Sequence, residues 1–249
     1  MKARRSGNVM PVIVGVALSV LVITAVTAPE AVGFDAKKKP KPVALSNEQI
    51  AAALLALDDF PAGWAALQGQ ASNAASATEG FCNGPNAQAR AQNAGVVGAG
   101  TTDFAQDPQN GPIISEQLFS FPTTDAAKLM MKTTSDQVKA CTSAFPVTPP
   151  SGSPAGLTLQ DTVTALSFPK FGADQASALR ESTTRQLDGQ NIGQPSIGDT
   201  VYFRKGNHVL AVTRAAASPD VNDLRMYVQN AYSKFGVALQ QARKATSKK

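Results

Sequence analysis

The chain has 249 residues, two cysteines and a formal net charge of +5. That positive charge lies at the two ends, because residues 42–242 carry 12 lysines and arginines against 16 aspartates and glutamates, a net charge of −4. A nucleic-acid-binding domain carries its positive charge on a folded face. We therefore expect no nucleic-acid partner. The body, about 200 residues, is long enough for one domain with a sizeable core.

The N-terminus combines a short basic region with an apolar run. Residues 11–28 contain no charged side chain and follow Lys2, Arg4 and Arg5. Such a run is long for a secretory signal and just long enough for a thin membrane crossing. Basic residues flank the run on both sides, so charge alone does not determine how the run would be oriented in a membrane. We expect residues 1–33 to be a signal peptide or an N-terminal membrane anchor.

A Lys/Pro-rich linker is predicted over residues 34–44, and a basic tail over residues 243–249. The linker contains four lysines: Lys37, Lys38, Lys39 and Lys41. Charged runs of this kind are usually solvated and flexible. The alternative is that these lysines contact anionic lipid head groups or a cell-wall polymer, from a spacer that proline holds extended.

The body, residues 45–242, opens with a predicted helix. Ser46 can cap this helix, Gln49 stands at the capping-box position, and Pro61 with Gly63 should end it.

Residues 65–112 are dominated by small and polar side chains, a composition typical of a linker. A short helix is predicted from Pro85 to Gly95, with the proline at its first position. The stretch "GVVGAG" that follows lacks the lysine and the strand–helix context of a phosphate-binding loop. We interpret it as a flexible loop.

The second half of the chain alternates between strand and helix patterns. We predict a strand over 111–122, a helix over 123–141 capped by Thr124, a loop over 146–154, strands over 156–168 and 176–187, a hairpin over 199–215 turning at Lys205, Gly206 and Asn207, and a helix over 218–244 beginning with Ser218 and Pro219. Segregated strands and helices indicate an α+β fold. The expected architecture is a single domain with a mostly antiparallel β-sheet of about four to five strands, packed by helices on one face and carrying one disulfide.

The two cysteines favour a disulfide between Cys82, in the small-residue region, and Cys141, at the buried side of a helix end. A metal site needs more ligands, and a nucleophilic thiol needs an imidazole partner. A crosslink would tie this poorly packed loop to the core. In the chain-entropy model it would raise the free energy of unfolding by roughly 4 kcal/mol. Disulfides persist in oxidising compartments. This interpretation therefore places the body outside the cytoplasm.

No catalytic motif was found in the sequence. The single histidine, His208, is interpreted as an ordinary hairpin residue because nothing beside it has a catalytic pattern. Ser167 and Lys170 match Ser-x-x-Lys, but the companion motifs are missing and Pro169 breaks the helical turn they need. We expect no enzyme activity, no catalytic residues, no metal and no cofactor.

Trp64, the only tryptophan, has two open interpretations. It either packs the first helix onto the sheet, or forms the wall of a ligand cleft, since one amphipathic ring supplies a large contact area.

Several stretches occur together in a recognisable order: "LDDFPAGW", "FCN", "FSFPTTDAAKLM", the second cysteine and "IGDTVYFRKGNHVLAVTR". Over residues 45–242 the chain resembles the actinobacterial extracellular sensor-domain family named after the receptor kinase PknH. The resemblance implies a compact α+β domain with a cleft and a sensory or ligand-binding role. The chain departs from the family in having one cysteine pair where the kinase ectodomain has two.

These observations predict a non-catalytic extracytoplasmic domain of the bacterial cell envelope, sensor-like or ligand-binding, whose partner is an unknown small molecule or envelope component. The protein would be secreted, or tethered to the plasma membrane by an N-terminal helix. The alternative is an interaction module that docks to another envelope protein or polymer without a small ligand.

Overall fold

The structure, a computed structural model, describes residues 42–67, 81–107, 111–141, 143–149 and 152–247. The expected signal or anchor segment and the linker lysines lie outside these ranges. Among the described residues, no helix is long and apolar enough to span a lipid bilayer.

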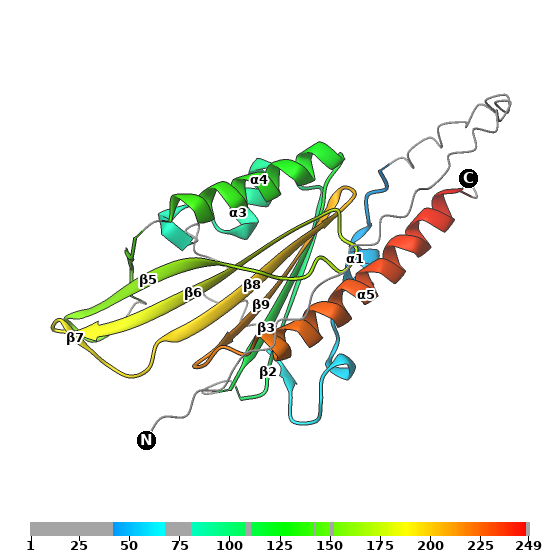
Figure 1. The fold of residues 1–249 in the computed structure, drawn as a ribbon. Helices are drawn as coiled ribbons and strands as arrows, with labels where there is room; N and C mark the ends of the chain where they lie inside the picture. Colours follow the sequence, from blue (N-terminus) through cyan, green and yellow to red (C-terminus); the bar gives the residue numbers. More distant parts are fainter. Residues whose placement is uncertain (1–41, 68–80, 108–110, 142, 150–151, 248–249) are drawn as a thin grey trace, which may run out of the picture. The chain divides into compact units, whose positions relative to one another are not determined.

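The elements follow one another as helices, 3-10 helices (η) and strands (Figure 1). In chain order they are α1 (Asn47–Ala53), η1 (Leu57–Asp59), β1 (Ala65–Ala66), η2 (Phe81–Asn83), α3 (Ala87–Asn93), β2 (Gly98–Ala105), β3 (Ile113–Ser120), α4 (Thr124–Ala140), β4 (Phe145–Val147), β5 (Leu157–Leu166), β6 (Gln175–Leu187), β7 (Gln190–Asn191), β8 (Ser196–Lys205), β9 (His208–Ala216) and α5 (Val221–Ser247).

Within the described ranges the strands form one nine-stranded sheet in the order β1-β2-β3-β9-β8-β6-β5-β4, with β7 paired to β6. All the described pairings are antiparallel. The α+β class and the antiparallel sheet are therefore confirmed, but the predicted count of four to five strands was too low. The strands that the sequence pattern missed are β1, β2, β4 and β7.

Strand β2 replaces the loop expected at "GVVGAG". Its glycines have a packing role, because a Cβ at Gly100 would lie 2.6 Å from Cγ2 of Ile50, and one at Gly98 would lie 2.8 Å from Cδ1 of the same residue. Helix α1 therefore lies directly on the backbone of β2. Glycine at these two positions lets the Ile50 side chain pack against the backbone of β2, which is why the stretch has the composition of a loop.

Helices cover both faces of the sheet, whereas one face was expected (Figure 1). In β9, Leu210 and Val212 belong to the apolar core beneath α1 and α5, while Val209 and Ala211 belong to the core beneath α3 and α4. Neighbouring strands alternate in the same way. This continuous run of apolar residues is typical of a strand buried on both sides, and it accounts for the second layer of helices.

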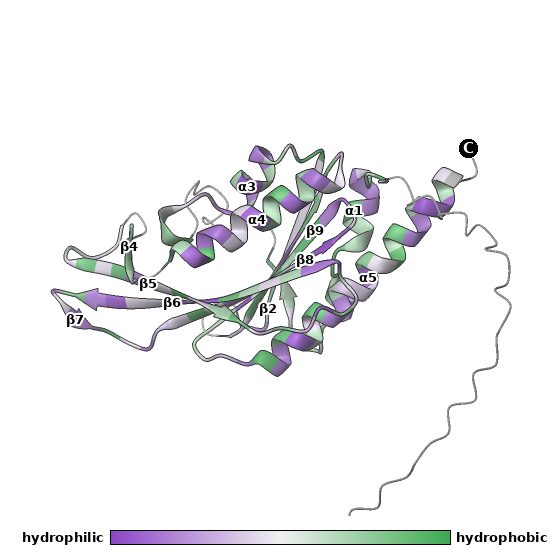
Figure 2. Cartoon of the chain, turned by 45° about the horizontal axis from the view of Figure 1, so that its top comes forward, coloured by the Kyte–Doolittle hydropathy of each residue, from purple (hydrophilic) through white to green (hydrophobic). Residues whose placement is uncertain are grey.

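Hydrophobic and hydrophilic residues alternate along helices α4 and α5 (Figure 2). In α4 the expected apolar stripe is confirmed, since Ala127, Met130 and Thr134 are fully buried. Each helix thus buries one side against its face of the sheet.

Several helix starts differ from the predictions by one or two residues. The capping box of Ser46 and Gln49 is confirmed. Helix α4 is capped by Thr123, whose side chain accepts a hydrogen bond from the Ala126 amide, instead of by Thr124. In α3 the cap is Asn86, so Pro85 precedes the helix. Adjacent hydroxyl or amide side chains compete for one cap, and sequence alone does not rank them.

The final helix begins later and ends later than predicted. The Asp220 carboxylate accepts hydrogen bonds from the Asn222 and Asp223 amides, which makes Asp220 the cap in place of Ser218. At its other end the helix runs to Ser247, through most of the segment interpreted as a flexible basic tail. Arginine and lysine are good helix formers and suit a helix C-terminus.

Cys82 and Cys141 form the expected disulfide, with their Cα atoms 5.7 Å apart. The bond joins η2 to the C-cap of α4 across 59 residues of sequence. It therefore holds η2 against the C-terminal end of α4.

Replacing both cysteines by serine should lower the free energy of unfolding by roughly 4 kcal/mol, because the bond closes a long loop in the unfolded chain. Urea denaturation without reductant measures this loss, and reduced wild-type protein is the matched control. Hydrogen exchange should show lost protection first at residues 81–94, with α5 changed least. Equal loss of protection in α5 would contradict this local role.

Candidate functional site

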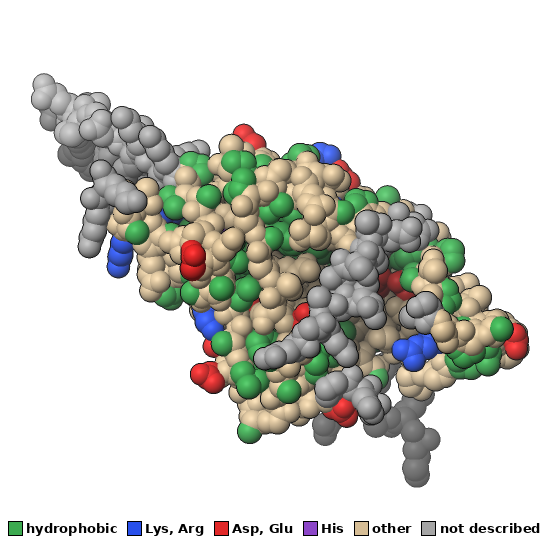
Figure 3. Space-filling model, turned by 180° about the vertical axis from the view of Figure 1, so that it is seen from behind, with side chains coloured by type: hydrophobic (Ala, Val, Ile, Leu, Met, Phe, Trp, Pro, Cys, Tyr) green, Lys and Arg blue, Asp and Glu red, His purple; other side chains and the backbone are tan. Residues whose placement is uncertain are grey.

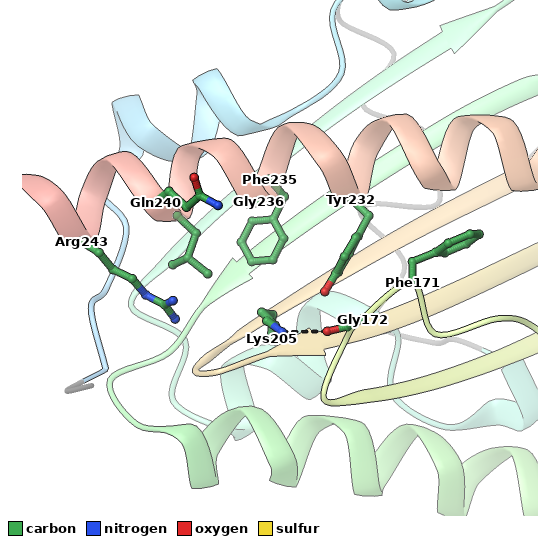
Figure 4. Close-up of a pocket in the computed structure, with 9 residues that line it drawn as sticks. Phe171, Gly172, Lys205, Tyr232, Phe235, Gly236, Gln240 and Arg243 are labelled. Atoms are coloured by element: carbon green, nitrogen blue, oxygen red, sulfur yellow. Dashed lines mark hydrogen bonds between the residues drawn. The ribbon is translucent and has the colours of Figure 1, made fainter. Parts of the chain in front are cut away.

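A pocket of about 290 Å³ lies between α5, the loop joining β5 to β6, and the turn joining β8 to β9 (Figure 4). It is lined by Phe171, Gly172, Lys205, Tyr232, Phe235, Gly236, Leu239, Gln240 and Arg243. The walls therefore combine aromatic and apolar side chains with two cations, the usual composition of a small-molecule site.

Gly236 leaves room in the pocket wall. It sits in the interior of α5, where glycine costs about 1 kcal/mol relative to alanine. A Cβ built at this position would meet no atom within 4 Å. Packing therefore does not require glycine here, and its absent side chain leaves open space beside the pocket.

Phe171 forms part of the wall in a strained backbone conformation. Its φ is +45°, a region that residues other than glycine seldom adopt. The ring is held between Phe168 and Phe203, with centroid distances of 6.0 and 6.2 Å. Strain of this kind persists only where the surroundings fix it, and it often occurs at ligand sites.

The Asp174 carboxylate fixes the loop of Phe171 to the β8–β9 turn. One oxygen, Oδ2, accepts from the Gly206 amide at 2.8 Å and pairs with the Arg204 guanidinium at 3.1 Å. The Asp174 amide in turn donates to the Arg204 carbonyl at 2.9 Å. Two segments about thirty residues apart are thus joined at the pocket floor by one acidic residue.

Two cations extend into the pocket from opposite walls (Figure 4). Lys205 Nζ donates to the Gly172 carbonyl at 2.7 Å and lies 3.7 Å from Asp174 Oδ1. Arg243 is exposed on the last turns of α5, and among the described residues no carboxylate forms an ion pair with it. The pocket therefore has an excess of positive charge.

His208 lies behind Phe235, at 5.7 Å between ring centroids. It directly follows the turn and is fully buried. Neither ring nitrogen makes a hydrogen bond of ordinary geometry with the described residues. Burial lowers its pKa to about 4, and the Arg243 charge acts in the same direction. His208 is therefore neutral at physiological pH.

Glu116 is a buried carboxyl beneath α1. It is 0% exposed, and its Oε2 accepts from the Leu55 amide at 2.6 Å. Burial raises its pKa to about 8, against the opposing effects of that hydrogen bond and of the Lys234 charge. Lys234 itself pairs with Asp59 at 2.6 Å. Glu116 is therefore mostly protonated at neutral pH.

On the opposite face of the sheet, Arg90 is a buried cation that the sequence analysis missed. It is 2% exposed and donates to Tyr202 Oη at 2.9 Å and to Gln137 Oε1 at 3.0 Å. Its guanidinium lies 5.1 Å from the centre of the Phe81 ring. These contacts connect α3 and η2 to α4 and β8 beside the disulfide, an arrangement that stabilises structure.

Three residues selected from sequence, Cys82, Cys141 and Trp64, are not among those that line the pocket. Cys82 and Cys141 contact the core beneath α3 and α4. Trp64 is 9% exposed and packs on Phe60 and Tyr227, with ring centroids 4.8 and 5.3 Å away. Its packing role is thus visible, whereas its role as a ligand wall stays a prediction. Among the described residues, no group of three or more His, Cys, Asp or Glu side chains could hold a metal.

No protein-family model matches the chain, and no curated protein matches it. Among solved structures, the fold is similar to the extracellular domain of PknH from Mycobacterium tuberculosis, with a TM-score of 0.51, 12% sequence identity, and coverage of 79% of this chain and 98% of that one. An uncharacterized protein from Mycobacterium smegmatis aligns with a TM-score of 0.31, at 8% identity over 55% of this chain and 64% of that one. The PknH likeness establishes a similar fold.

Glu116→Gln should make the protein less sensitive to rising pH. The unfolded chain loses this proton near pH 4.5, while the folded chain retains it to about pH 8, so stability falls as pH rises between these values. Glutamine keeps the acceptor for the Leu55 amide without the ionisation. We expect the variant to match wild type near about pH 5 and to exceed it by a few kcal/mol near about pH 8.

Urea denaturation across this pH range measures the difference. The matched control is Glu48→Gln, at an exposed helix-end carboxyl. Parallel stability curves for Glu116→Gln and wild type would contradict the buried, protonated state of Glu116.

Proposed function

We propose that the chain is an extracytoplasmic, non-catalytic sensor-like domain that binds a small molecule in the pocket beneath α5. The observation that carries this proposal is the pocket wall, where a mid-helix glycine leaves space and a strained Phe171 is held in place. Both features cost stability, and packing does not require the glycine. A bound ligand would explain why they are kept.

Three observations support the location. The fold resembles that of an extracellular domain, the chain has a disulfide, and an apolar run precedes the body. Disulfides are typical of oxidising compartments. Secretion or tethering by residues 1–33 belongs to this proposal.

The side chains that line the pocket support binding over catalysis. Lys205, Tyr232 and Arg243 can donate hydrogen bonds and attract charge. A nucleophile would need a general base beside it, but His208 is buried behind Phe235.

Acidic and basic side chains are scattered over the described residues of the face seen in Figure 3. This distribution supports the expectation that nucleic acid is not the partner. Contact of Lys37, Lys38, Lys39 and Lys41 with anionic lipid or cell-wall polymer stays a prediction, because these residues lie outside the described ranges.

Gly236→Leu should fill the pocket and abolish ligand retention. Native mass spectrometry of the protein isolated from its own envelope fraction should show an adduct on wild type that is absent from the variant. Gly236→Ala is the matched control, because it adds one methyl group in open space and should stabilise α5 by about 1 kcal/mol while keeping the adduct. An adduct retained by Gly236→Leu would refute this location for the ligand.

A further inference from the structure

We infer that the pocket beneath α5 takes a small amphipathic anion, whose carboxylate or phosphate lies between Lys205 and Arg243 and whose apolar part lies against the aromatic wall. This inference rests on the proposed function, because it names the ligand class of the same pocket. It follows from the charge, the wall and the size of the pocket.

The charge at the pocket favours an anion. Lys205 and Arg243 are both lining residues, and Asp174, the carboxylate that pairs with Lys205, is shared with Arg204. Asp174 pairs with Arg204 at 3.1 Å and with Lys205 at 3.7 Å, so one negative charge is shared by two positive ones. No acidic residue occurs in α5 between Lys234 and Ser247. An incoming anion therefore meets a net positive charge, contributed by the β8–β9 turn and by α5.

Most of the remaining pocket lining is apolar. The rings of Phe171, Tyr232 and Phe235 line it together with Leu239, and Phe235 and Leu239 are buried. His208, behind Phe235, is neutral at physiological pH and so adds no charge to this side. A hydrated inorganic ion would leave the partly exposed rings of Phe171 and Tyr232 uncovered, whereas an apolar chain would remove them from water.

The volume of about 290 Å³ is at the lower end of the range for ligand pockets. It suits a free amphipathic anion with a short chain or a single ring, and is small for a lipid with two long chains. Arg243 can form two parallel hydrogen bonds to a carboxylate or phosphate, while Lys205 supplies a point charge from the opposite wall.

Equilibrium dialysis of the full chain with labelled octanoate tests the inference, with 1-octanol and inorganic phosphate as competitors. Octanoate should bind saturably to wild type, and neither competitor should displace it at equal concentration. Gly236→Leu should abolish binding, and this variant also corrects for octanoate that partitions elsewhere.

Arg243→Gln should weaken octanoate binding about tenfold, since it removes a charged hydrogen-bond donor, and Arg243→Lys should restore part of the loss. Arg225→Gln, at an exposed arginine on the same helix away from the pocket, is the matched control and should bind as wild type does.

Three results would overturn the inference. If octanol displaces octanoate equally well and Gly236→Leu abolishes binding of both, the pocket binds ligands but the anionic head is irrelevant. If phosphate alone competes fully, the apolar wall is irrelevant. If Gly236→Leu binds octanoate as wild type does, the pocket is not the site, and the proposed function fails together with the ligand class.

Discussion

The architecture depends on the burial of the central strands on both of their faces. In β9 the side chains alternate between two apolar cores, and in β8 Val201 and Phe203 face one core while Tyr202 faces the other. A strand of this kind can lie only in the middle of a sheet, with helices on either side. The antiparallel hairpin of β8 and β9 therefore lies in the middle of the sheet, between β3 and β6.

The two faces have different roles as a consequence. On one face, the disulfide and the contacts of Arg90 hold α3 and α4 in place, so a region with few large apolar residues is fixed by covalent and polar bonds. On the other face, α5 extends past the sheet core, and the Asp174 contacts hold an aromatic loop below it. The space left between this loop and α5 is the pocket. The α3–α4 face is thus held by the disulfide and polar contacts, and the pocket lies on the α5 face.

Much of the fold follows from local sequence patterns, because alternation, capping residues and a Gly-Asn turn are each read from neighbouring residues. What could not be predicted depends on contacts between distant segments. Gly98 and Gly100 suggest a loop until Ile50 is seen against them. The pocket residues come from three segments, and only one of them carried a local signal: Gly236, an isolated glycine inside a strongly periodic helix. Trp64 was selected because its ring is large, and in the structure this ring packs in the core.

An NMR titration of isotope-labelled protein with octanoate tests the central claim most directly, because backbone amide shifts report the location of a bound ligand without any mutation. The account predicts saturable shifts concentrated at Gly172, Lys205, Gly236 and Arg243, with the amides of α3 and α4 unchanged. Shifts concentrated instead around Arg90 on the opposite face of the sheet, or no saturable shifts at all, would contradict it.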